Sequence, residues 1–404
     1  MVRSLAVLSM HTSPLAQPGR GDSGGMNVYV RELAGSLAQA GVDTTVFVRR
    51  DAIDLPDVVA VEPGLQVVHI DAGPPELAKE DLPEVLDAFT AGVGAHIRTA
   101  GDVDALHANY WLSGVAAHRL KHELSLPLVA TFHTLARVKA DGGDPEPDRR
   151  AEAEAEVIGC ADTILASCAT EAEQLVDHYG ARPERIEIVP PGVDHAFFSP
   201  GDRRGARQAL GLGDHPVLLF VGRVQPLKGL TVAIAALADL GRPDAHLVVV
   251  GGASGADGPA ELARCHALVA QLGLEGRVHF VPPQPHHLLS TYYRAADVVL
   301  VPSRSESFGL VALEAAACGT PVVAAAVGGL TTLVDDGVTG FLVEGRAPAD
   351  HAAAVRKVLD DHVLAAELAA NAASLARNYT WSTAAARLRR VYADLAARSL
   401  VRCA

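Results

Sequence analysis

The hydrophobic pattern of the first half of the chain alternates between short apolar runs and longer Ala-rich amphipathic stretches. The apolar runs predict strands at residues 5–10, 44–48, 65–70, 105–108, 128–132, 163–166 and 186–189. Helical patterns lie between them, at residues 28–40, from about Ser113 onward, and at 149–158. Nearly continuous apolar strands separated by helices are typical of a parallel sheet that is covered on both faces.

The same pattern restarts in the second half. Strands are predicted at residues 217–221, 247–250, 278–281, 298–301, 322–325 and 340–343, with helices at 231–240, 260–273, 286–295, 310–317 and 348–359. A stretch rich in proline and glycine, residues 190–201, separates the halves. The fold class is therefore α/β, with two doubly wound domains at residues 1–195 and 202–380. Residues 381–404 form a final helix with no strand after it, which is expected to pack back on the first domain.

Composition and charge narrow the function. The 34 basic and 48 acidic side chains give a net charge of −14, which disfavours nucleic acid and anionic membranes as partners. No apolar run approaches the length of a membrane span, and residues 1–9 lack the core and cleavage site of a signal peptide. We therefore expect a cytoplasmic protein without integral membrane contact.

The five cysteines show no metal-binding spacing. Cys160 and Cys168 are far in sequence from any histidine pair, so no zinc site is expected. The odd number of cysteines favours a reducing compartment, with the cysteines serving as small buried hydrophobic residues.

Ligands of open α/β sheets bind beyond the carboxyl ends of the strands, so each strand-to-helix junction is a candidate site. The first, residues 18–27, is glycine-rich and precedes a helix, which suits a phosphate; a flexible loop is the alternative. It is not the GxGxxG fingerprint, and no Walker sequence occurs in the chain. Nicotinamide cofactors and P-loop ATP hydrolysis are therefore disfavoured.

The second junction, residues 221–229, carries Arg223 and Lys228. A planar guanidinium and a point-charge ammonium five residues apart can clamp a diphosphate. Surface cations on a loop are the alternative.

The third junction, residues 302–315, carries Glu306 in a loop and Glu314 in the helix that follows. A carboxylate at Glu314 can accept hydrogen bonds from the two hydroxyls of a ribose, and Glu306 can do the same for a sugar. The amides of Ser307, Phe308, Gly309 and Leu310 can donate to a phosphate. The alternative is that Glu314, in so apolar a helix, is satisfied within the protein.

Together these junctions resemble the retaining glycosyltransferases of family 4. The resemblance rests on E-x7-E at Glu306–Glu314 and G-R-x-x-P-x-K-G at Gly222–Gly229, and extends over essentially the whole chain. It implies the GT-B fold: two Rossmann-like domains facing across a cleft, with the nucleotide sugar on the second domain and the acceptor on the first.

Residues 11–19 and 21–29 are similar to a narrower group, the inositol-phosphate glycosyltransferases of mycothiol biosynthesis. This likeness implies transfer of N-acetylglucosamine from UDP to 1L-myo-inositol 1-phosphate. It implies acceptor-binding residues His11, Asn27, Lys79, Tyr110, Thr134 and Arg150, and donor-binding residues that include Gly25 and Gln284. Lys79 and Arg150 would supply charge, and Tyr110 and Thr134 hydroxyl donors, to a phosphate; four unrelated loop residues are the alternative.

The chain departs from this group in three places. Asn109 stands where the group has a histidine, and Gln284 where it tends to have an arginine. Residues 139–147 form a shorter segment, so Arg149 competes with Arg150 as the phosphate ligand. These departures bear on the acceptor more than on the reaction type.

The implied mechanism needs no dedicated base. Arg223, Lys228 and the amides after Glu306 would stabilise charge on the leaving diphosphate, and the departing phosphate would take the acceptor proton. The resemblance places His133 against the sugar, with a hydrogen-bonding strand end as the alternative. Glu306 binds sugar in this scheme and is not a nucleophile. The catalytic set is therefore His133, Arg223, Lys228 and Glu306.

No resident cofactor or metal ligand is expected. Asp102 and Asp104 form a DxD pair, but they precede a strand and so lie at the wrong end of the sheet. A divalent ion is expected, if at all, on the substrate diphosphate. Close relatives suggest a homodimer. Three alternatives remain open: a transferase with another donor or a non-phosphorylated acceptor, a sugar-nucleotide epimerase, and a non-catalytic nucleotide-sugar binder.

Overall fold

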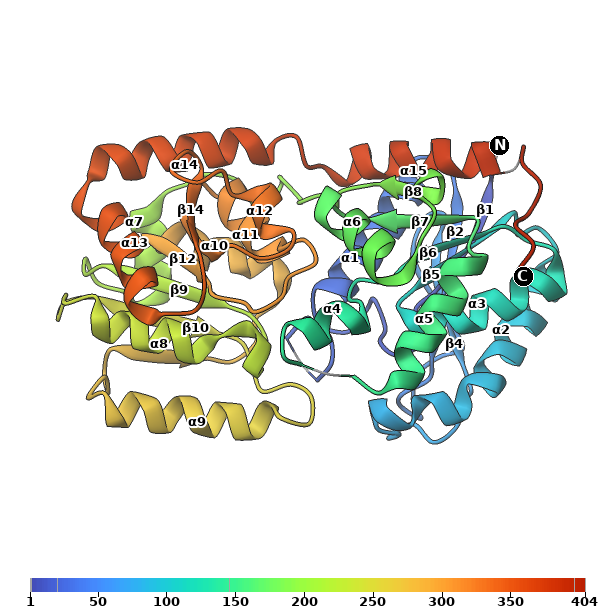
Figure 1. Cartoon of the computed structure of the whole chain (residues 1–404), viewed down its shortest axis with the longest axis horizontal. Helices are drawn as coiled ribbons and strands as arrows, with labels where there is room; N and C mark the ends of the chain where they lie inside the picture. The colour runs from blue at the N-terminus through green and yellow to red at the C-terminus, as the bar shows by residue number, and fades with distance from the viewer. Residues whose placement is uncertain (1, 20, 145, 396, 404) are drawn as a thin grey trace. The chain divides into compact units, whose positions relative to one another are not determined.

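The computed structural model of the chain (Figure 1) describes residues 2–19, 21–144, 146–395 and 397–403. It divides into two compact units. Unit 1 comprises residues 1–16, 26–191 and 381–404, and unit 2 comprises residues 17–25 and 192–380. Each unit contains its own parallel sheet. The candidate chemistry is located on each unit separately below.

Unit 1 is built on an eight-stranded sheet with the order β3-β4-β2-β1-β5-β6-β7-β8. Its strands are β1 (Ser4–Leu8), β2 (Asp43–Arg49), β3 (Val58–Glu62), β4 (Leu65–Ile70), β5 (Ala105–Asn109), β6 (Leu128–Thr131), β7 (Thr163–Ala166) and β8 (Ile186–Ile188). All neighbours pair in parallel except β3, which runs antiparallel to β4 at the edge. The predicted strands are all found, and β3 is an addition.

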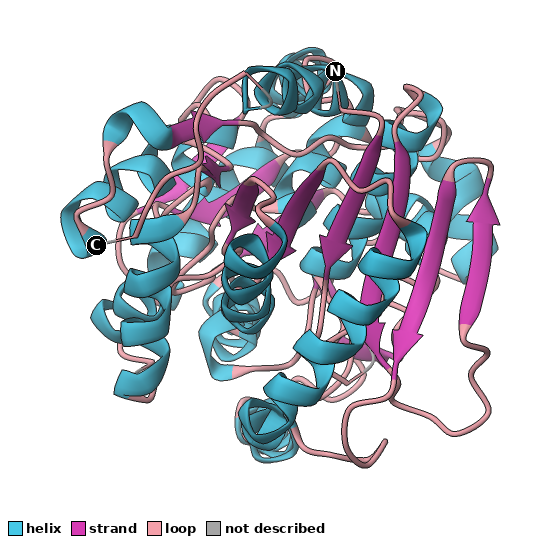
Figure 2. Cartoon of the chain, turned by 90° about the vertical axis from the view of Figure 1, so that its right-hand side faces the viewer, coloured by secondary structure: helices cyan, strands magenta, loops and turns pink. Residues whose placement is uncertain are grey.

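Helices cover both faces of this sheet (Figure 2). They are α1 (Gly25–Gln39), α2 (Leu86–Ala100), α3 (Trp111–Leu124), α4 (Ala136–Asp141), α5 (Asp148–Cys160), α6 (Ala169–Tyr179) and α15 (Trp381–Leu395), with the 3-10 helices η1 (Lys79–Val85) and η2 (Pro183–Arg185). Strands such as β1 and β6 are buried almost end to end, as strands with helices on both sides must be.

The order of the strands reverses between β1 and β5, which pair in parallel at the middle of the sheet. Ligands of doubly wound sheets bind outside the carboxyl ends of the strands at this kind of switch point. The segments that leave these two strands begin at Ser9 and Tyr110. The fold therefore places His11 and Tyr110 where a ligand of unit 1 is expected.

The last helix belongs to unit 1. The Tyr392 hydroxyl lies 2.8 Å from Nδ1 of His107 on β5, and the other ring nitrogen of His107 lies 2.9 Å from the Thr131 hydroxyl. Trp381 packs edge-on against Tyr29 of α1, with 5.7 Å between ring centroids. These buried contacts hold α15 to the sheet of unit 1.

Stability should depend on pH through His107, because its imidazole is buried and uncharged in the folded chain. Burial lowers the pKa of His107 to about 3, whereas an unfolded histidine titrates near 6.5. Between these values the unfolded chain binds the extra proton, so the free energy of unfolding rises with pH. The contribution is complete above about pH 6.5 and is lost as the pH falls toward 3, at up to about 1.4 kcal/mol per pH unit.

Denaturant titrations between about pH 5 and 7 measure this slope. His107→Gln should flatten it, whereas His362→Gln, at an exposed position of α14, should leave it unchanged. Equal slopes for the wild type and His107→Gln would show that His107 takes no part.

Unit 2 is built on a six-stranded sheet with the order β11-β10-β9-β12-β13-β14. Its strands, all paired in parallel, are β9 (Val217–Val221), β10 (His246–Val250), β11 (Val278–Val281), β12 (Val298–Val301), β13 (Val322–Ala325) and β14 (Gly340–Val343). Its switch point lies between β9 and β12. The loops that follow these two strands carry Arg223, Lys228 and Glu306.

The helices of unit 2 are α7 (Arg203–Leu210), α8 (Leu230–Asp239), α9 (Gly258–Gln271), α10 (Leu289–Ala295), α11 (Leu310–Ala317), α12 (Leu330–Leu333), α13 (Pro348–Asp360) and α14 (His362–Ala376), with the 3-10 helices η3 (Pro226–Lys228) and η4 (His286–Leu288). The helices predicted in the second half are found as α8, α9, α10, α11 and α13, and α7, α12 and α14 are additions. No helix in the part of the chain that the structure describes has the length and apolar character to cross a membrane.

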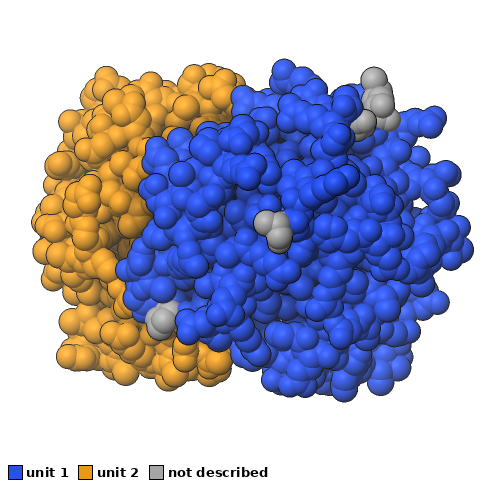
Figure 3. Space-filling view, turned by 45° about the vertical axis from the view of Figure 1, so that its right-hand side comes forward, with its two compact units in different colours: residues 1–16, 26–191, 381–404 blue, residues 17–25, 192–380 orange. Residues whose placement is uncertain are grey.

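The chain passes between the two units more often than the sequence predicts, because the structure adds an excursion near the N-terminus. The segment 17–25, which ends at the first residue of α1, belongs to unit 2. Figure 3 colours the two units separately. The segment's contacts with unit 2 include the Gln17 side-chain amide, which donates to the Pro283 carbonyl at 3.0 Å. The glycine-rich segment is therefore part of the same unit as Arg223 and Lys228.

Candidate active site

Two loops of unit 2 are locked together at its switch point. The amide of Arg304, after β12, donates to the carbonyl of Leu227, after β9, at 2.7 Å. Gly229 closes the turn after Lys228 with φ +73°, and a Cβ there would lie 2.1 Å from the Pro302 carbonyl oxygen. Only glycine allows this close approach of the two backbones, which brings Lys228 against the loop that carries Glu306.

Lys228 and Glu306 form an ion pair. Nζ lies 2.7 Å from Oε2, and the side chains are 22% and 19% exposed. The Ser303 hydroxyl donates to the same carboxylate oxygen at 3.3 Å. Two residues predicted to touch the donor are therefore adjacent, and the position of each depends on the other.

Glu314 is buried in α11 and is satisfied within unit 2. His286 Nε2 lies 2.7 Å from one carboxylate oxygen, and the Tyr293 hydroxyl donates to the other at 2.7 Å. Burial and the nearby Glu314 charge raise the pKa of Tyr293 well above its usual value, so the phenol stays a donor. This is the alternative that the sequence left open. A carboxylate has about four lone-pair directions, so a ribose would share Glu314 with His286 and Tyr293.

The segment 17–25 lies against the same part of unit 2. An Arg223 guanidinium nitrogen is 3.4 Å from the Asp22 carbonyl oxygen, and the Gly19 amide donates to the Ser23 carbonyl at 2.9 Å. A Cβ at Gly25 would lie 3.4 Å from the Leu310 side chain, at the first residue of α11. Arg20, within this segment, lies outside the described residues.

The structure thus gathers most of the predicted donor residues on one edge of unit 2. Gly309 precedes α11 with φ +102°, so the amides of the first turn of α11 are those of a helix N-terminus. Ser307 and Phe308 lead into this turn. Gln284 lies in the loop after β11, where its amide donates to the Pro282 carbonyl at 2.9 Å.

In unit 1, the predicted acceptor residues converge on the ring of Tyr110. Lys79 Nζ lies 5.3 Å and the Arg150 guanidinium carbon 4.9 Å from the ring centroid. The His11 ring is 4.4 Å away, centroid to centroid. Burial raises the pKa of Tyr110, with Arg150 acting in the opposite direction, so the hydroxyl is protonated. Two cations and a hydroxyl donor therefore meet at the switch point.

Arg150 is anchored on both sides. It donates to the carbonyl and hydroxyl oxygens of Thr134, both at 2.9 Å. It also pairs with Glu154 at 2.8 Å and Glu146 at 2.9 Å. Arg149 points elsewhere, since it is exposed and donates to the Glu80 carbonyl at 3.0 Å. Of the two neighbouring arginines, Arg150 is the one that the structure places with Tyr110 and Thr134.

Asn27 has a supporting position. Its side-chain nitrogen lies 2.6 Å from both the Thr12 hydroxyl and the Ser13 carbonyl oxygen, and the side chain is buried. These hydrogen bonds hold the turn that follows β1. The turn includes His11, so Asn27 fixes the backbone that presents His11 to Tyr110.

His133 stands at the end of β6 in the left-handed conformation, with φ +63°. Its Nε2 lies 2.8 Å from Oδ1 of Asn109, and its ring packs edge-on against Tyr29 at 4.8 Å. Burial lowers the pKa of His133 to about 3, with nearby His107 adding to the effect. His133 is therefore a neutral hydrogen-bonding group, and its proton is on Nε2 because the Asn109 oxygen can only accept.

Asn109, where the chain departs from the family, is a positioning residue for His133. Asn109→Ala removes the acceptor that orients His133, so we expect kcat to fall about ten-fold, the cost of one hydrogen bond of about 1.4 kcal/mol. Asn109→His, which restores an acceptor, should recover most of the rate. Steady-state kinetics on the three proteins test this, and an unchanged kcat for Asn109→Ala would contradict it.

Two expectations about metals have different outcomes. Asp104 accepts hydrogen bonds from the amides of Arg3 and Ser4 at 2.6 and 3.0 Å, which places the DxD pair at the amino ends of the strands, away from the switch point of unit 1. Cys160 is far in the sequence from any histidine pair, which is why no zinc site is expected there. The fold brings it beside His118 and His122, because α3 and α5 pack together.

Two protein families match the chain, one on each half. The family described as Glycosyltransferase Family 4 matches residues 23–197, and that described as Glycosyl transferases group 1 matches residues 202–375. The D-inositol 3-phosphate glycosyltransferase of Geodermatophilus obscurus is 51% identical and covers 94% of this chain and 86% of its own length. The protein of the same name from Acidothermus cellulolyticus is 48% identical, with coverage of 97% and 90%. The chain belongs to the D-inositol 3-phosphate glycosyltransferase family.

Solved structures agree with this membership. Sucrose-phosphate synthase from Thermosynechococcus elongatus superimposes with a TM-score of 0.92 at 33% identity, covering 98% of this chain and 99% of that one. Anabaena HepE (Alr3699) in complex with UDP-glucose gives 0.78 at 22% identity, with coverage of 97% and 99%, a likeness of fold alone. The predicted resemblance and the GT-B fold class are confirmed, and the chain is a glycosyltransferase. Membership in the D-inositol 3-phosphate glycosyltransferase family argues against the epimerase and the non-catalytic binder.

Proposed function

We propose that the protein transfers N-acetylglucosamine from UDP-N-acetylglucosamine to 1L-myo-inositol 1-phosphate, with retention at the anomeric carbon, as a step of mycothiol biosynthesis. The acceptor is the compound that the names of the relatives call D-inositol 3-phosphate. The single observation that carries the proposal is the cluster around Tyr110. Lys79, Arg150, Thr134 and His11 come from four separate segments and meet at the switch point of unit 1.

The composition of this cluster favours a phosphate monoester over a neutral acceptor. Lys79 and Arg150 carry positive charge, and Tyr110 and Thr134 carry hydroxyls that can donate. Charge-assisted hydrogen bonds are about twice as strong as neutral ones. Glu146 and Glu154 hold Arg150 in place, so its guanidinium is already oriented when the acceptor arrives.

Unit 2 supports the donor half of the proposal. Arg223, Lys228 and the N-terminus of α11 supply donors for a diphosphate, and Glu314 supplies an acceptor for ribose hydroxyls. A solved structure of the HepE protein contains UDP-glucose on the same fold. We assign the UDP-sugar to this edge of unit 2.

The chemistry then follows from the charge distribution. The bond between the anomeric carbon and the β-phosphate oxygen breaks, and the acceptor hydroxyl oxygen bonds to the same face of the sugar. The hydroxyl proton passes to the leaving phosphate, so the products are UDP and the glycosylated inositol phosphate. Negative charge grows on the β-phosphate in the transition state, where Arg223 and Lys228 stabilise it most.

His133 and Glu306 would act on the sugar itself. A neutral His133 can hydrogen-bond to a hydroxyl without repelling the cationic, oxocarbenium-like sugar, which a protonated imidazole would do. Glu306 can accept from a sugar hydroxyl while it stays paired with Lys228. No resident cofactor is proposed, and a divalent ion would act by binding the substrate diphosphate. We also propose cytoplasmic action, where these charged substrates are available, and a homodimer.

A matrix of donors and acceptors with mass detection of the product tests the proposal. UDP-N-acetylglucosamine, UDP-glucose and UDP-galactose are each combined with inositol phosphate, free inositol or no acceptor. The proposal predicts one major product, an N-acetylhexosamine added to inositol phosphate, whose anomeric configuration by NMR matches that of the donor. If a product forms only when free inositol is the acceptor, or if the enzyme prefers another donor, the protein belongs with the alternative transferases.

A further inference from the structure

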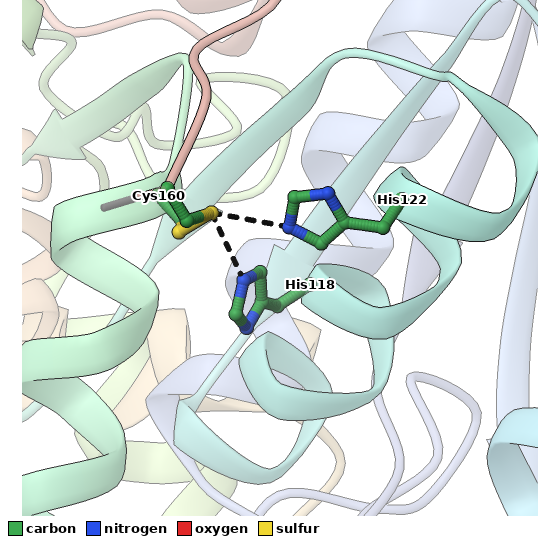
Figure 4. Close-up of side chains that lie close together, drawn as sticks. His118, His122 and Cys160 are labelled. Carbon is green, nitrogen blue, oxygen red and sulfur yellow. Dashed lines mark hydrogen bonds between the residues drawn. A yellow bond between two sulfur atoms is a disulfide. The ribbon is translucent and has the colours of Figure 1, made fainter.

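Four potential metal ligands meet on unit 1 in a place that the transfer reaction does not use (Figure 4). His118 and His122 lie one turn apart on α3, Cys160 is the last residue of α5, and Cys403 lies in the tail beyond α15. The four side chains thus come from three segments that are far apart in the sequence.

The ligand atoms of this cluster are close together. Cys403 Sγ lies 3.3 Å from His118 Nε2 and 3.1 Å from His122 Nε2. All four ligand atoms lie within 4.8 Å of one another. Around a tetrahedral zinc ion, with bonds of about 2.0 Å to nitrogen and 2.3 Å to sulfur, neighbouring ligand atoms are about 3.3–3.8 Å apart. Once the bond between the two sulfur atoms is reduced, small side-chain movements therefore suffice to reach that geometry.

We propose that His118, His122, Cys160 and Cys403 form a structural Cys2His2 zinc site. The site forms after a thiol reductant has supplied the two electrons and two protons that convert the Cys160–Cys403 disulfide into two thiols. On coordination each thiol gives up its proton, and the two thiolates neutralise the charge of Zn²⁺. Four protein ligands fill a tetrahedral site and leave no position for a substrate. The site fixes the tail to the body of unit 1.

Surrounding residues favour this role. Glu156 Oε1 lies 3.5 Å from Nδ1 of His118, the ring nitrogen opposite the one that faces sulfur. A carboxylate behind a histidine ligand selects its tautomer and orientation in many metal sites. The tail is also held just before Cys403, because the Val401 amide donates to Asp162 at 2.6 Å. Asp162 is in turn paired with buried Lys121 at 2.8 Å.

The competing chemistry is a disulfide. In the structure Cys160 and Cys403 form a disulfide bond. A disulfide requires nothing of His118 or His122, yet both imidazoles direct Nε2 at the same sulfur atom. The other cysteines, Cys168, Cys265 and Cys318, are buried, and the described residues hold no second cluster of this kind.

The site lies apart from the proposed acceptor cluster. Tyr110 directly precedes the start of α3, whereas His118 and His122 are on its later turns, more than about 10 Å along the helix axis. Substitutions at the zinc site should therefore change metal content and stability more than turnover.

Metal analysis of the full chain, purified with a thiol reductant that is then removed, tests the proposal. Elemental analysis by mass spectrometry should find one zinc ion per chain. Exchange into Co²⁺ should give visible bands of a tetrahedral site and a thiolate charge-transfer band in the near ultraviolet. His122→Ala and Cys403→Ser should abolish both signals, whereas the matched variants His96→Ala and Cys168→Ser in the same unit should keep them.

A further variant separates orientation from ligation. Glu156→Gln should bind zinc about 10- to 100-fold more weakly without loss of stoichiometry at saturating metal. His122 is at the surface, so His122→Ala is expected to fold, and a chelator should lower the unfolding temperature of the wild type but not of this variant. A reduced chain that binds no zinc or Co²⁺ would overturn the proposal, as would metal bound equally by the wild type and His122→Ala.

Discussion

Lys228→Met should lower kcat for sugar transfer by about 10²–10³-fold, the usual loss when one donor to a developing oxyanion is removed. The reason is that charge grows on the β-phosphate only as the glycosidic bond breaks. An ammonium beside it therefore stabilises the transition state more than the bound donor. The KM for the UDP-sugar should change much less than kcat.

Lys357→Met is the matched control, since Lys357 is an exposed lysine on α13 of the same unit. It should transfer sugar at the wild-type rate. A loss of transfer equal to that of Lys228→Met would show that the substitution acts through the general charge or stability of unit 2.

The ion pair with Glu306 makes a double-mutant cycle informative. Nζ of Lys228 and Oε2 of Glu306 are 2.7 Å apart, so each single substitution also disturbs the other residue. The effects of Lys228→Met and Glu306→Gln on kcat should therefore be non-additive. Full additivity would mean that the two residues act independently, contrary to the geometry.

Lys79→Met should lower kcat/KM for inositol phosphate by about 10²-fold and leave turnover with free inositol unchanged. A lost hydrogen bond from a charged group costs about 1.5–3 kcal/mol, and the phosphate is the only part of the acceptor that needs the charge of Lys79. The ratio of kcat/KM values for the two acceptors is the measurement, because a general defect cancels in that ratio.

Arg149→Met is the control for this prediction. Arg149 is a neighbouring cation in the sequence, but it donates to a backbone carbonyl on the surface. We expect its acceptor preference to match that of the wild type. If Lys79→Met keeps the preference for the phosphorylated acceptor, the cluster around Tyr110 is not the phosphate site.

Strongly apolar elements could be predicted from the sequence almost to the residue. Strand β13 (Val322–Ala325) is an apolar run that follows Pro321, and helix α11 (Leu310–Ala317) is apolar except for Glu314 and follows Gly309. Strand β3 (Val58–Glu62) was missed although its first four residues are apolar. It is an antiparallel edge strand that leads directly into β4 with no helix between them, so it lies outside the strand–helix alternation on which the prediction depends. Helix α14 (His362–Ala376) was missed because its Ala-rich sequence gives little contrast between its faces.

Candidate site residues could be predicted from the sequence because they follow strands, whereas the side chains that contact them could not be predicted. Lys228 and Glu306 are 78 positions apart, and Glu314 reaches His286 and Tyr293 across 28 and 21 positions. Such contacts depend on how loops close over the sheet, which hydrophobic periodicity does not encode. The same holds for His122 and Cys403, which are separated by 281 positions.

The position of the glycine-rich segment shows the same limit. The sequence of this segment predicts a phosphate-binding loop before a helix. On that basis the segment is expected to belong to the same domain as the helix, the first domain. The structure assigns residues 17–25 to unit 2, with Asp22 beside Arg223. Only three-dimensional contacts reveal this. Gln17 and Gly19 lie against Pro283, and Asp22 lies beside Arg223, each more than 200 positions away in the sequence.

A crystal structure of the protein with UDP and inositol phosphate bound tests the central claim most directly. The account predicts the UDP diphosphate within hydrogen-bonding distance of Arg223 and Lys228, its ribose at Glu314, and the inositol phosphate group between Lys79 and Arg150. A diphosphate bound remote from Arg223 and Lys228, or an acceptor phosphate that touches neither Lys79 nor Arg150, would contradict it.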